Sequence, residues 1–406
     1  MNLLFLDAYF EPEQIAFTHL EHDLIERLVK EGNKIEVICP SPTRGISKET
    51  AKKYRRRKRE RLYGGRVHVM RFPAPQEKRN PAVRAIRYFW CNYITYLIGV
   101  KRQSCDLVFC NSTPPTQGWI AGKVAKKLNV PLVYSLQDIF PDSLVTTGLS
   151  KKDSLLWRIG RKLENATYRR CSKIIVITQA MKENLVKKGV RAEQIEIINN
   201  WIDTDQIRPV KREENRLFSE LGIDRSKYIV LYAGNFGEAQ GAEIILDVAA
   251  KMQEDPNIEF VIFGGGSGYE RAVEKAERLC NVFIHPLMPQ DRIAEVYSMG
   301  DVALITCKSG VGQSGMPSKT WSIMACSTPV IASFDLDSEL CRIIEKTKSG
   351  ICVEPEKADE IVKAVKALQN EKIANHDIRA QMKSLASKEK CTSEYLRVFR
   401  EALKSS

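Results

Sequence analysis

The segment from Ser309 to Ala325 combines residue types that could hold a phosphate group. Three glycines precede Pro317, and proline is favoured at the first position of a helix, so the pattern predicts a helix that starts there. The unpaired N–H groups of a helix start attract anions, and Ser318 and Lys319 would add a hydroxyl group and a positive charge. A hydrogen bond from lysine to phosphate contributes roughly 1.5 to 3 kcal/mol. The segment is a candidate diphosphate site, and a structural helix with an exposed lysine is the alternative interpretation.

Two glycine-rich segments follow predicted strands and could bring backbone N–H groups close to a ligand. The first runs from Gly234 to Glu243 and the second from Gly264 to Gly268. Neither matches the Walker loop or the GxGxxG fingerprint of dinucleotide sites. Taken alone, the first segment is better explained by an ordinary turn between strand and helix, and the second is compatible with a flexible turn as well as with a ligand site. The candidate ligand-binding residues in these segments are Gly234, Asn235, Gly237, Gln240 and Gly265.

Aspartates and histidines give little sign of a metal site. Asp203 and Asp205 form one Asp-x-Asp triplet, and Asp335 and Asp337 form another, a pattern that can bind a divalent cation. The first triplet opens a polar segment, and the second precedes Ser338, where aspartate is typical of a helix start. The five histidines include no HExxH, and the nucleophilic GxSxG elbow is also missing. We therefore expect no metal site and no resident cofactor.

Short β-branched runs alternate with segments of helical period, which is typical of βαβ units and parallel sheets. In such sheets, ligands bind beyond the carboxyl ends of the strands. Strands are predicted in the first half at 2–7, 34–39, 67–71, 106–110, 132–136, 173–178 and 196–198, and in the second half at 228–233, 258–263, 281–285, 302–306, 329–333 and 351–353.

A chain of 406 residues is long enough for two domains of about 200 residues each. The polar segment 203–227 is the best candidate for a linker, so we place the first domain at 1–204 and the second at 205–386. The segment 387–406 is predicted to contain an amphipathic helix, which could pack back on the first domain. Two parallel sheets that face each other would leave one cleft between them.

The charge is +13 overall, and residues 44–66 hold eleven Lys or Arg against two Glu. A charged surface loop with a helix, a nucleic-acid site, an anionic lipid surface and a phosphorylated acceptor are all compatible with this segment. Residues 88–100 are apolar and aromatic, too short to cross a bilayer, and could lie on a membrane or form a partly buried helix. The start of the chain lacks the features of a secretory signal, and the eleven scattered cysteines suggest reduced thiols, so we expect a cytoplasmic protein.

Several motifs in this order resemble glycosyltransferase family 4, and within it the branch of bacterial capsule and O-antigen proteins similar to WbuB, an aminofucosyltransferase-like protein. The resemblance implies the GT-B fold, in which two Rossmann-like α/β domains face each other across a cleft. It also implies a nucleotide-diphosphate sugar donor, retention of the anomeric configuration and no metal requirement. The motifs are the loop and helix within 6–32, followed by 137–142, 176–178, 198–203, 232–237, 239–241, 317–319 and 325–330.

The resemblance also suggests where the donor would bind. The base would lie near Leu287 and Met288, the diphosphate near Pro317 to Lys319 and Gly234 to Gln240, and the sugar would point toward Asp138. On the acceptor side the candidates are Glu11, Gln14 and Phe17.

This chain departs from the family pattern at three places. Asn235 and Gln240 replace the arginine and lysine that clamp the diphosphate in most members. The paired glutamates of the family fall on Ser314 and Ser322, and the Gly-Gly pair of the first loop falls within 14–17. Lys319 would therefore supply most of the positive charge.

We expect transfer of a sugar, with UDP as the favoured nucleotide, to a growing surface polysaccharide on a polyprenyl diphosphate at the inner membrane face. Lys319 would stabilise the leaving diphosphate, and Asp138 could orient or deprotonate the acceptor. One alternative is a UDP-sugar epimerase of the same fold, against which the scarcity of histidines speaks. A non-catalytic nucleic-acid-binding protein would explain the charge but not the second half, so nucleic acid is not an expected partner.

Overall fold

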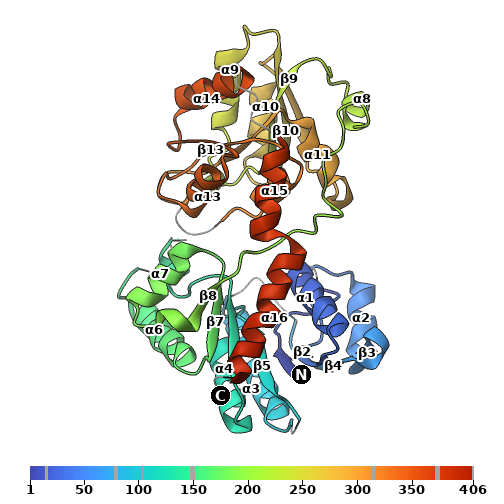
Figure 1. Ribbon diagram of the computed structural model, residues 1–406, viewed down its shortest axis with the longest axis vertical. Coiled ribbons are helices and arrows are strands. Elements are labelled where there is room, and N and C mark those ends of the chain that lie inside the picture. The colour runs from blue at the N-terminus through green and yellow to red at the C-terminus, as the bar shows by residue number, and fades with distance from the viewer. Residues whose placement is uncertain are drawn as a thin grey trace. The chain divides into compact units, whose positions relative to one another are not determined.

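The computed structural model describes residues 1–13, 17–76, 81–102, 104–146, 151–312, 316–370 and 375–404. The chain divides into two compact units (Figure 1). The first unit comprises Met1–Asn200 with Cys391–Ser406, and the second comprises Trp201–Lys390. Each unit contains one sheet, and the hydrophobic residues of both units are buried against these sheets.

The sheet of the first unit has eight strands in the order β3-β4-β2-β1-β5-β6-β7-β8. All neighbouring strands pair in parallel except β3, which is antiparallel to β4. The strands are β1 (Asn2–Leu6), β2 (Lys34–Pro40), β3 (Arg59–Leu62), β4 (Val67–Phe72), β5 (Leu107–Asn111), β6 (Leu132–Leu136), β7 (Lys173–Val176) and β8 (Ile195–Ile197).

Helices cover both faces of this sheet. On one face, Leu4 and Leu6 of β1 share a buried cluster with Cys91 of α3, Val124 of α4 and Tyr168 of α6. Side chains alternate along a strand, so the residues between them point to the opposite face. The helices of the first unit are α1 (Thr18–Lys30), α2 (Lys48–Arg56), α3 (Pro81–Gly99), α4 (Gln117–Leu128), α5 (Asp142–Thr146), α6 (Leu155–Tyr168), α7 (Gln179–Lys187) and α16 (Lys388–Lys404), whose first residues belong to the second unit.

The last helix, α16, packs on the face of the first sheet opposite to α4. The ring of Phe399 lies 6.5 Å from that of Phe5 and 5.3 Å from that of Phe109, measured between centroids. The hydroxyl groups of Tyr395 and Ser135 are 3.0 Å apart. The amphipathic pattern near the end of the sequence thus forms a core helix of the first unit.

The sheet of the second unit is parallel throughout, in the order β11-β10-β9-β12-β13-β14. Its strand order reverses between β9 and β12, which is the switch point where Rossmann-like folds bind ligands. The strands are β9 (Tyr228–Asn235), β10 (Ile258–Gly265), β11 (Val282–Pro286), β12 (Val302–Thr306), β13 (Val330–Ser333) and β14 (Gly350–Val353). The helices are α8 (Leu217–Leu221), α9 (Ile244–Met252), α10 (Tyr269–Ala276), α11 (Ile293–Met299), α12 (Lys319–Ala325), α13 (Glu339–Thr347), α14 (Ala358–Asn370) and α15 (Asn375–Ala386).

The structure confirms every predicted strand to within a few residues and adds β3, which the sequence did not indicate. This strand lies inside the basic segment 44–66, which we predicted as loop and helix. Its sequence, RERL, lacks the β-branched and aromatic residues that favour strands. Pairing with β4, in which Arg59 lies opposite Met70, gives this segment its strand conformation.

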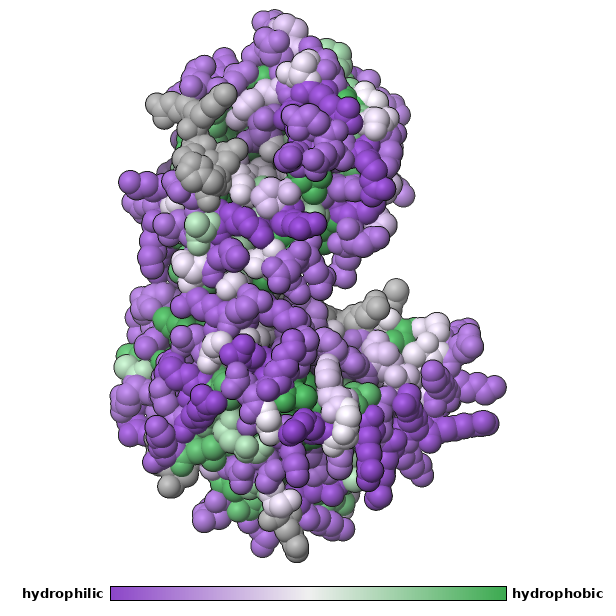
Figure 2. Space-filling view, turned by 45° about the vertical axis from the view of Figure 1, so that its right-hand side comes forward, coloured by the Kyte–Doolittle hydropathy of each residue, from purple (hydrophilic) through white to green (hydrophobic). Residues whose placement is uncertain are grey.

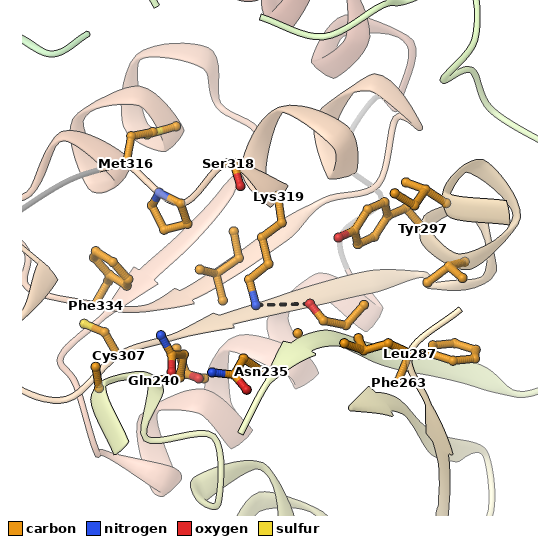
Figure 3. A pocket seen from close by; sticks show the side chains of 18 of the residues that line it. Asn235, Gln240, Phe263, Leu287, Tyr297, Cys307, Met316, Ser318, Lys319 and Phe334 are labelled. Carbon is orange, nitrogen blue, oxygen red and sulfur yellow. Dashed lines mark hydrogen bonds between the residues drawn. The ribbon is translucent and has the colours of Figure 1, made fainter. Parts of the chain in front are cut away.

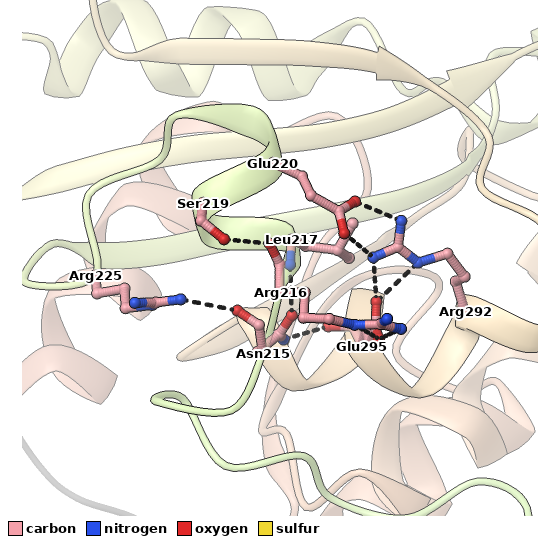
Figure 4. Close-up of polar contacts among 8 residues, drawn as sticks. All are labelled: Asn215, Arg216, Leu217, Ser219, Glu220, Arg225, Arg292 and Glu295. Carbon is pink, nitrogen blue, oxygen red and sulfur yellow. Dashed lines mark hydrogen bonds and ion pairs between the residues drawn. The ribbon is translucent and has the colours of Figure 1, made fainter.

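Part of the predicted linker 203–227 is a core element of the second unit (Figure 4). Leu217 and Phe218 of α8 are fully buried in the main hydrophobic cluster. Arg292, just before α11, pairs with Glu220 on α8 and with Glu295 on α11. The interpretation of this part as a linker was wrong. Its apolar residues Leu217 and Phe218 pack into the core, and its charged residue Glu220 pairs with Arg292 near α11.

The long helix α3 contains the aromatic segment predicted to lie on a membrane or in the domain. Among the described residues, no helix has both the length and the hydropathy that a bilayer span requires.

Candidate active site

A cavity of about 550 Å³ lies in the second unit, where the strand order of its sheet reverses (Figure 3). Residues at the carboxyl ends of β9, β10 and β12 form its floor, together with residues that follow β13 and residues around the start of α12. This is the place where an open parallel sheet offers a binding site. The cavity is lined by Ala233, Gly234, Asn235, Ala239, Gln240, Phe263, Leu287, Met288, Ile293, Val296, Tyr297, Ile305, Thr306, Cys307, Val311, Met316, Pro317, Ser318, Lys319 and Phe334.

Lys319 reaches from the start of α12 to the end of β9 (Figure 3). Its ammonium group donates a hydrogen bond to the carbonyl oxygen of Ala233, 3.3 Å away, and lies 4.2 Å from the ring centroid of Tyr232. Burial lowers the pKa of Lys319 to about 7, since desolvation disfavours the cation. Without a ligand, the amine of Lys319 is therefore only partly protonated near neutral pH. A bound anion would favour its protonated, charged form.

The helix behind this lysine is short. It begins at Lys319, two residues later than predicted, and spans seven residues. A turn already forms before it, because Thr320 donates its N–H group to the carbonyl oxygen of Pro317 at 3.0 Å. Since a helix dipole grows with aligned peptide units, the charge of Lys319 contributes more to anion binding than the helix does.

Two side-chain amides lie on the floor of the cavity beneath Lys319 (Figure 3). Asn235 ends β9, and Gln240 ends a short turn that follows. A Cβ atom at Gly237 would lie 2.4 Å from Oε1 of Gln240 and 2.8 Å from Nδ2 of Asn235. A Cβ atom at Gly234 would lie 2.9 Å from Nζ of Lys319. Glycine at these positions is what lets the amides and the lysine come together.

Apolar residues form the two ends of the cavity. Leu287, Phe263 and Tyr297 lie at one end, and Phe334 and Met316 lie at the other (Figure 3). Leu287 is 53% exposed, and its N–H group donates to the carbonyl oxygen of Gly264 at 3.0 Å. The cavity thus joins a polar, cationic middle to apolar ends that could hold flat or apolar groups.

The remaining donor-side candidates lie near the cavity without lining it. Gly237 lies next to the amide groups of Asn235 and Gln240. Gly265 lies next to Leu287, which a side chain at this position would contact. Ser322 lies one turn along α12, where its carbonyl oxygen accepts from Cys326. Ser314 is outside the described residues.

One aspartate of each triplet accepts hydrogen bonds from backbone N–H groups. Asp335 accepts from Gly310 at 2.9 Å and from Gly312 at 2.7 Å, and so holds the loop that follows β12. Asp203 accepts from the backbone of Asp205 at 2.9 Å. Within the described part of the chain, no group of three or more His, Cys, Asp or Glu is arranged to hold a metal ion.

The acceptor-side candidates lie in the first unit, after its strands. Asp138 follows β6 and is exposed. Glu11 pairs with His22 and raises the pKa of that imidazole, and its carbonyl oxygen accepts from Arg71. Phe17 is the residue before α1, and Gln14 is outside the described residues.

Sequence reasoning found Leu287 and Met288 of the lining but missed other lining residues, in particular Thr306, Cys307 and Phe334. These residues end β12 or follow β12 and β13 directly. The sequence analysis expected ligand-binding residues beyond the carboxyl ends of the parallel strands. It could not identify these residues, because the sequence does not show which strands are neighbours in the sheet.

Two family models match the chain in succession. Residues 21–206 match "Glycosyltransferase Family 4" and residues 213–386 match "Glycosyl transferases group 1". These matches exclude the alternative of a non-catalytic nucleic-acid-binding protein.

Relatives and solved structures agree with these matches. A protein of Escherichia coli K12 named as a colanic acid biosynthesis glycosyl transferase, WcaI, is 25% identical over 90% of this chain and 91% of its own. WbjE of Pseudomonas aeruginosa, named as a glycosyltransferase, is 28% identical over 69% of this chain and 70% of its own. The structure of HepE from Anabaena in complex with UDP superposes with a TM-score of 0.71 at 16% identity, covering 99% of this chain and 100% of that one.

The fold is therefore GT-B, as the resemblance implied. The chain is a glycosyltransferase related to enzymes of polysaccharide biosynthesis, with a Glycosyltransferase Family 4 domain in its first half and a group 1 domain in its second.

Proposed function

We propose that this enzyme moves a sugar from a nucleotide diphosphate, with UDP as the favoured nucleotide, to a growing surface polysaccharide. The transfer retains the anomeric configuration and needs no metal ion. The observation that carries the proposal is the buried amine of Lys319, held at the switch point of the second sheet beside two amides. HepE, whose structures hold UDP or UDP-glucose, supports the choice of donor.

The cavity has a suitable size and polarity for such a donor. A volume of about 550 Å³ falls in the range of small-molecule sites. The diphosphate would lie against Lys319, Ser318 and the amides of Asn235 and Gln240. The base would pack on the apolar end that contains Leu287 and Met288.

The chemistry would depend on charge that develops in the transition state. As the anomeric C–O bond breaks, negative charge accumulates on the leaving diphosphate. Lys319 would donate to that charge from a partly buried position, where such an interaction is stronger than in solution. Asp138 would accept the proton of the acceptor hydroxyl.

The acceptor is proposed to be a glycan on a polyprenyl diphosphate at the inner face of the plasma membrane. The relation to WcaI, named for colanic acid biosynthesis, supports a surface polysaccharide. Such an acceptor remains in the bilayer, so its enzyme must work at the membrane surface.

The first experiment is a thermal-shift screen of nucleotide sugars, followed by transfer from the sugar that stabilises the protein. A ligand at a hundred times its dissociation constant should stabilise by about 2.7 kcal/mol. The proton spectrum of the product gives its anomeric configuration. Release of nucleotide that does not depend on an acceptor would instead favour the epimerase alternative.

Lys319→Ala tests the role of the lysine in transfer. It should lower turnover roughly 100-fold to 1000-fold, as expected when one group that stabilises a developing oxyanion is removed. Lys346→Ala removes an exposed lysine on α13 and serves as the matched control. Equal turnover of both variants would exclude the proposed diphosphate site.

A further inference from the structure

The outer surface of α3 and α6 exposes large apolar side chains in unusual density. On α3, Ile86, Phe89 and Tyr93 are 65%, 72% and 58% exposed. On α6, Leu155 and Ile159 are 76% and 57% exposed. The spacing of three or four residues places each set along one side of its helix. Trp90, Leu97 and Leu156 are further exposed apolar residues of these two helices.

Both helices lie in the same layer. α4 contacts α3 and α6, and all three share the buried cluster on one face of the first sheet. The exposed side chains therefore point away from that sheet, on a common outer surface that we call the α3–α6 face. The face of the molecule drawn in Figure 2 is largely hydrophilic, with hydrophobic residues in small groups.

The exposed charged side chains of α3, α4 and α6 are all basic. The sequences of α3 and α4 contain no Asp or Glu, and the one acid of α6, Glu164, is buried and paired with Arg161 and Lys188. Arg158 and Lys162 are exposed on the same side of α6 as Leu155 and Ile159. By contrast, the sequences of α1 and α16 contain acidic as well as basic residues.

We propose that the α3–α6 face docks on an anionic lipid bilayer. Aromatic and aliphatic side chains enter the headgroup region of a bilayer, and lysine and arginine are attracted to its negative surface. A face of this kind with no exposed acid on its helices fits that surface better than it fits a second copy, which would bring together like charges. The proposal rests on the proposed function for its purpose, which is to bring the enzyme to a lipid-linked acceptor.

Flotation of the full-length protein with vesicles tests this proposal. Vesicles of phosphatidylcholine with phosphatidylglycerol should bind the protein, and vesicles of phosphatidylcholine alone should bind it more weakly. Phe89→Ser with Leu155→Ser should weaken binding by about tenfold or more, because two apolar side chains lose their burial. Val186→Ser with Ile197→Ser is the control, since these residues are 42% and 38% exposed but belong to α7 and β8 and not to α3 or α6.

The charge is tested separately. Arg158→Gln with Lys162→Gln should weaken binding to anionic vesicles roughly 30-fold, at about 1 kcal/mol for each charge. Lys363→Gln with Lys366→Gln removes the same charge from the exposed side of α14 and should leave binding unchanged.

Three outcomes would overturn the proposal. The first is no binding to anionic vesicles, and the second is binding that neither pair of substitutions weakens. The third is self-association in solution, detected by light scattering, that Phe89→Ser with Leu155→Ser abolishes, because it would assign the face to a second copy. Binding of UDP-sugars without vesicles is measured on the same variants, so failure of the proposed function is seen independently of failure to dock.

Discussion

The most informative single residue is Lys319, because its amine is partly buried and makes no ion pair with a carboxylate of the described residues. Among the described residues, the carbonyl oxygen of Ala233 and the ring of Tyr232 are close to it, and burial lowers its pKa to about 7. Burial of this kind disfavours the charged form of a lysine, and a bound anion favours that form. A dianionic diphosphate would restore it.

The pH dependence of donor binding follows from this. Above pH 7 the free lysine is mostly neutral, and a bound diphosphate raises its pKa, so binding takes up a proton there. The dissociation constant should rise about tenfold per pH unit above 7 until the pKa of the complex is reached. Calorimetry in buffers of different ionisation heat measures the proton uptake. Lys319→Arg, whose charge does not titrate here, should flatten the curve, and a wild-type protein without proton uptake would refute the mechanism.

Gly237 tests the arrangement of the two amides. A Cβ atom there would collide with the ends of the Gln240 and Asn235 side chains, which can move aside. Gly237→Ala should therefore weaken donor binding several-fold, by about 1 kcal/mol for a displaced hydrogen bond, with little loss of stability. Donor titration and thermal unfolding of the variant check the two parts separately, and unchanged affinity would remove the amides from the site.

Among the secondary-structure elements, most strands could be predicted from the sequence. Elements whose conformation depends on residues far away in the sequence could not. Runs of β-branched and other apolar residues, such as that of β10, are typical of buried parallel strands, and each predicted run forms a strand in the structure. The edge strand β3 and the short helix α8 escaped prediction, because their conformation depends on Met70 of β4 and on Arg292 near α11. For the same reason Lys319 was recognised from its motif, but its burial against Tyr232 was not.

The helix α16 should stabilise the first unit although it ends the sequence. Phe399 is fully buried against Phe5 and Phe109, so Phe399→Ala should cost about 3 to 5 kcal/mol of unfolding free energy. Its neighbour Arg400 is largely exposed and makes one long ion pair with Glu31, so Arg400→Ala should cost less than about 1 kcal/mol. Urea unfolding, followed by two spectroscopic probes, compares the unfolding free energies of the two variants. Equal losses of unfolding free energy would contradict the packing described for this helix.

Over the whole molecule, 63 basic residues outnumber 50 acidic ones, and part of the surplus lies in the first unit on α2, α4 and α6. Attraction between exposed charges is screened within about 8 Å at physiological ionic strength. Vesicle binding should therefore weaken as salt is raised, while binding of the donor in its buried site should change less. Flotation and donor titration over one salt series would detect the difference, and parallel loss of both would contradict it.

The central claim is that a buried lysine, without a metal ion, receives the diphosphate of a nucleotide sugar. The most direct measurement is calorimetric titration of the UDP-sugar selected by thermal shift, in the presence of EDTA. Wild type and Lys346→Ala should bind it equally, and Lys319→Ala should bind it about tenfold more weakly or worse. Binding that appears only when manganese is added, or that survives Lys319→Ala unchanged, would contradict the account.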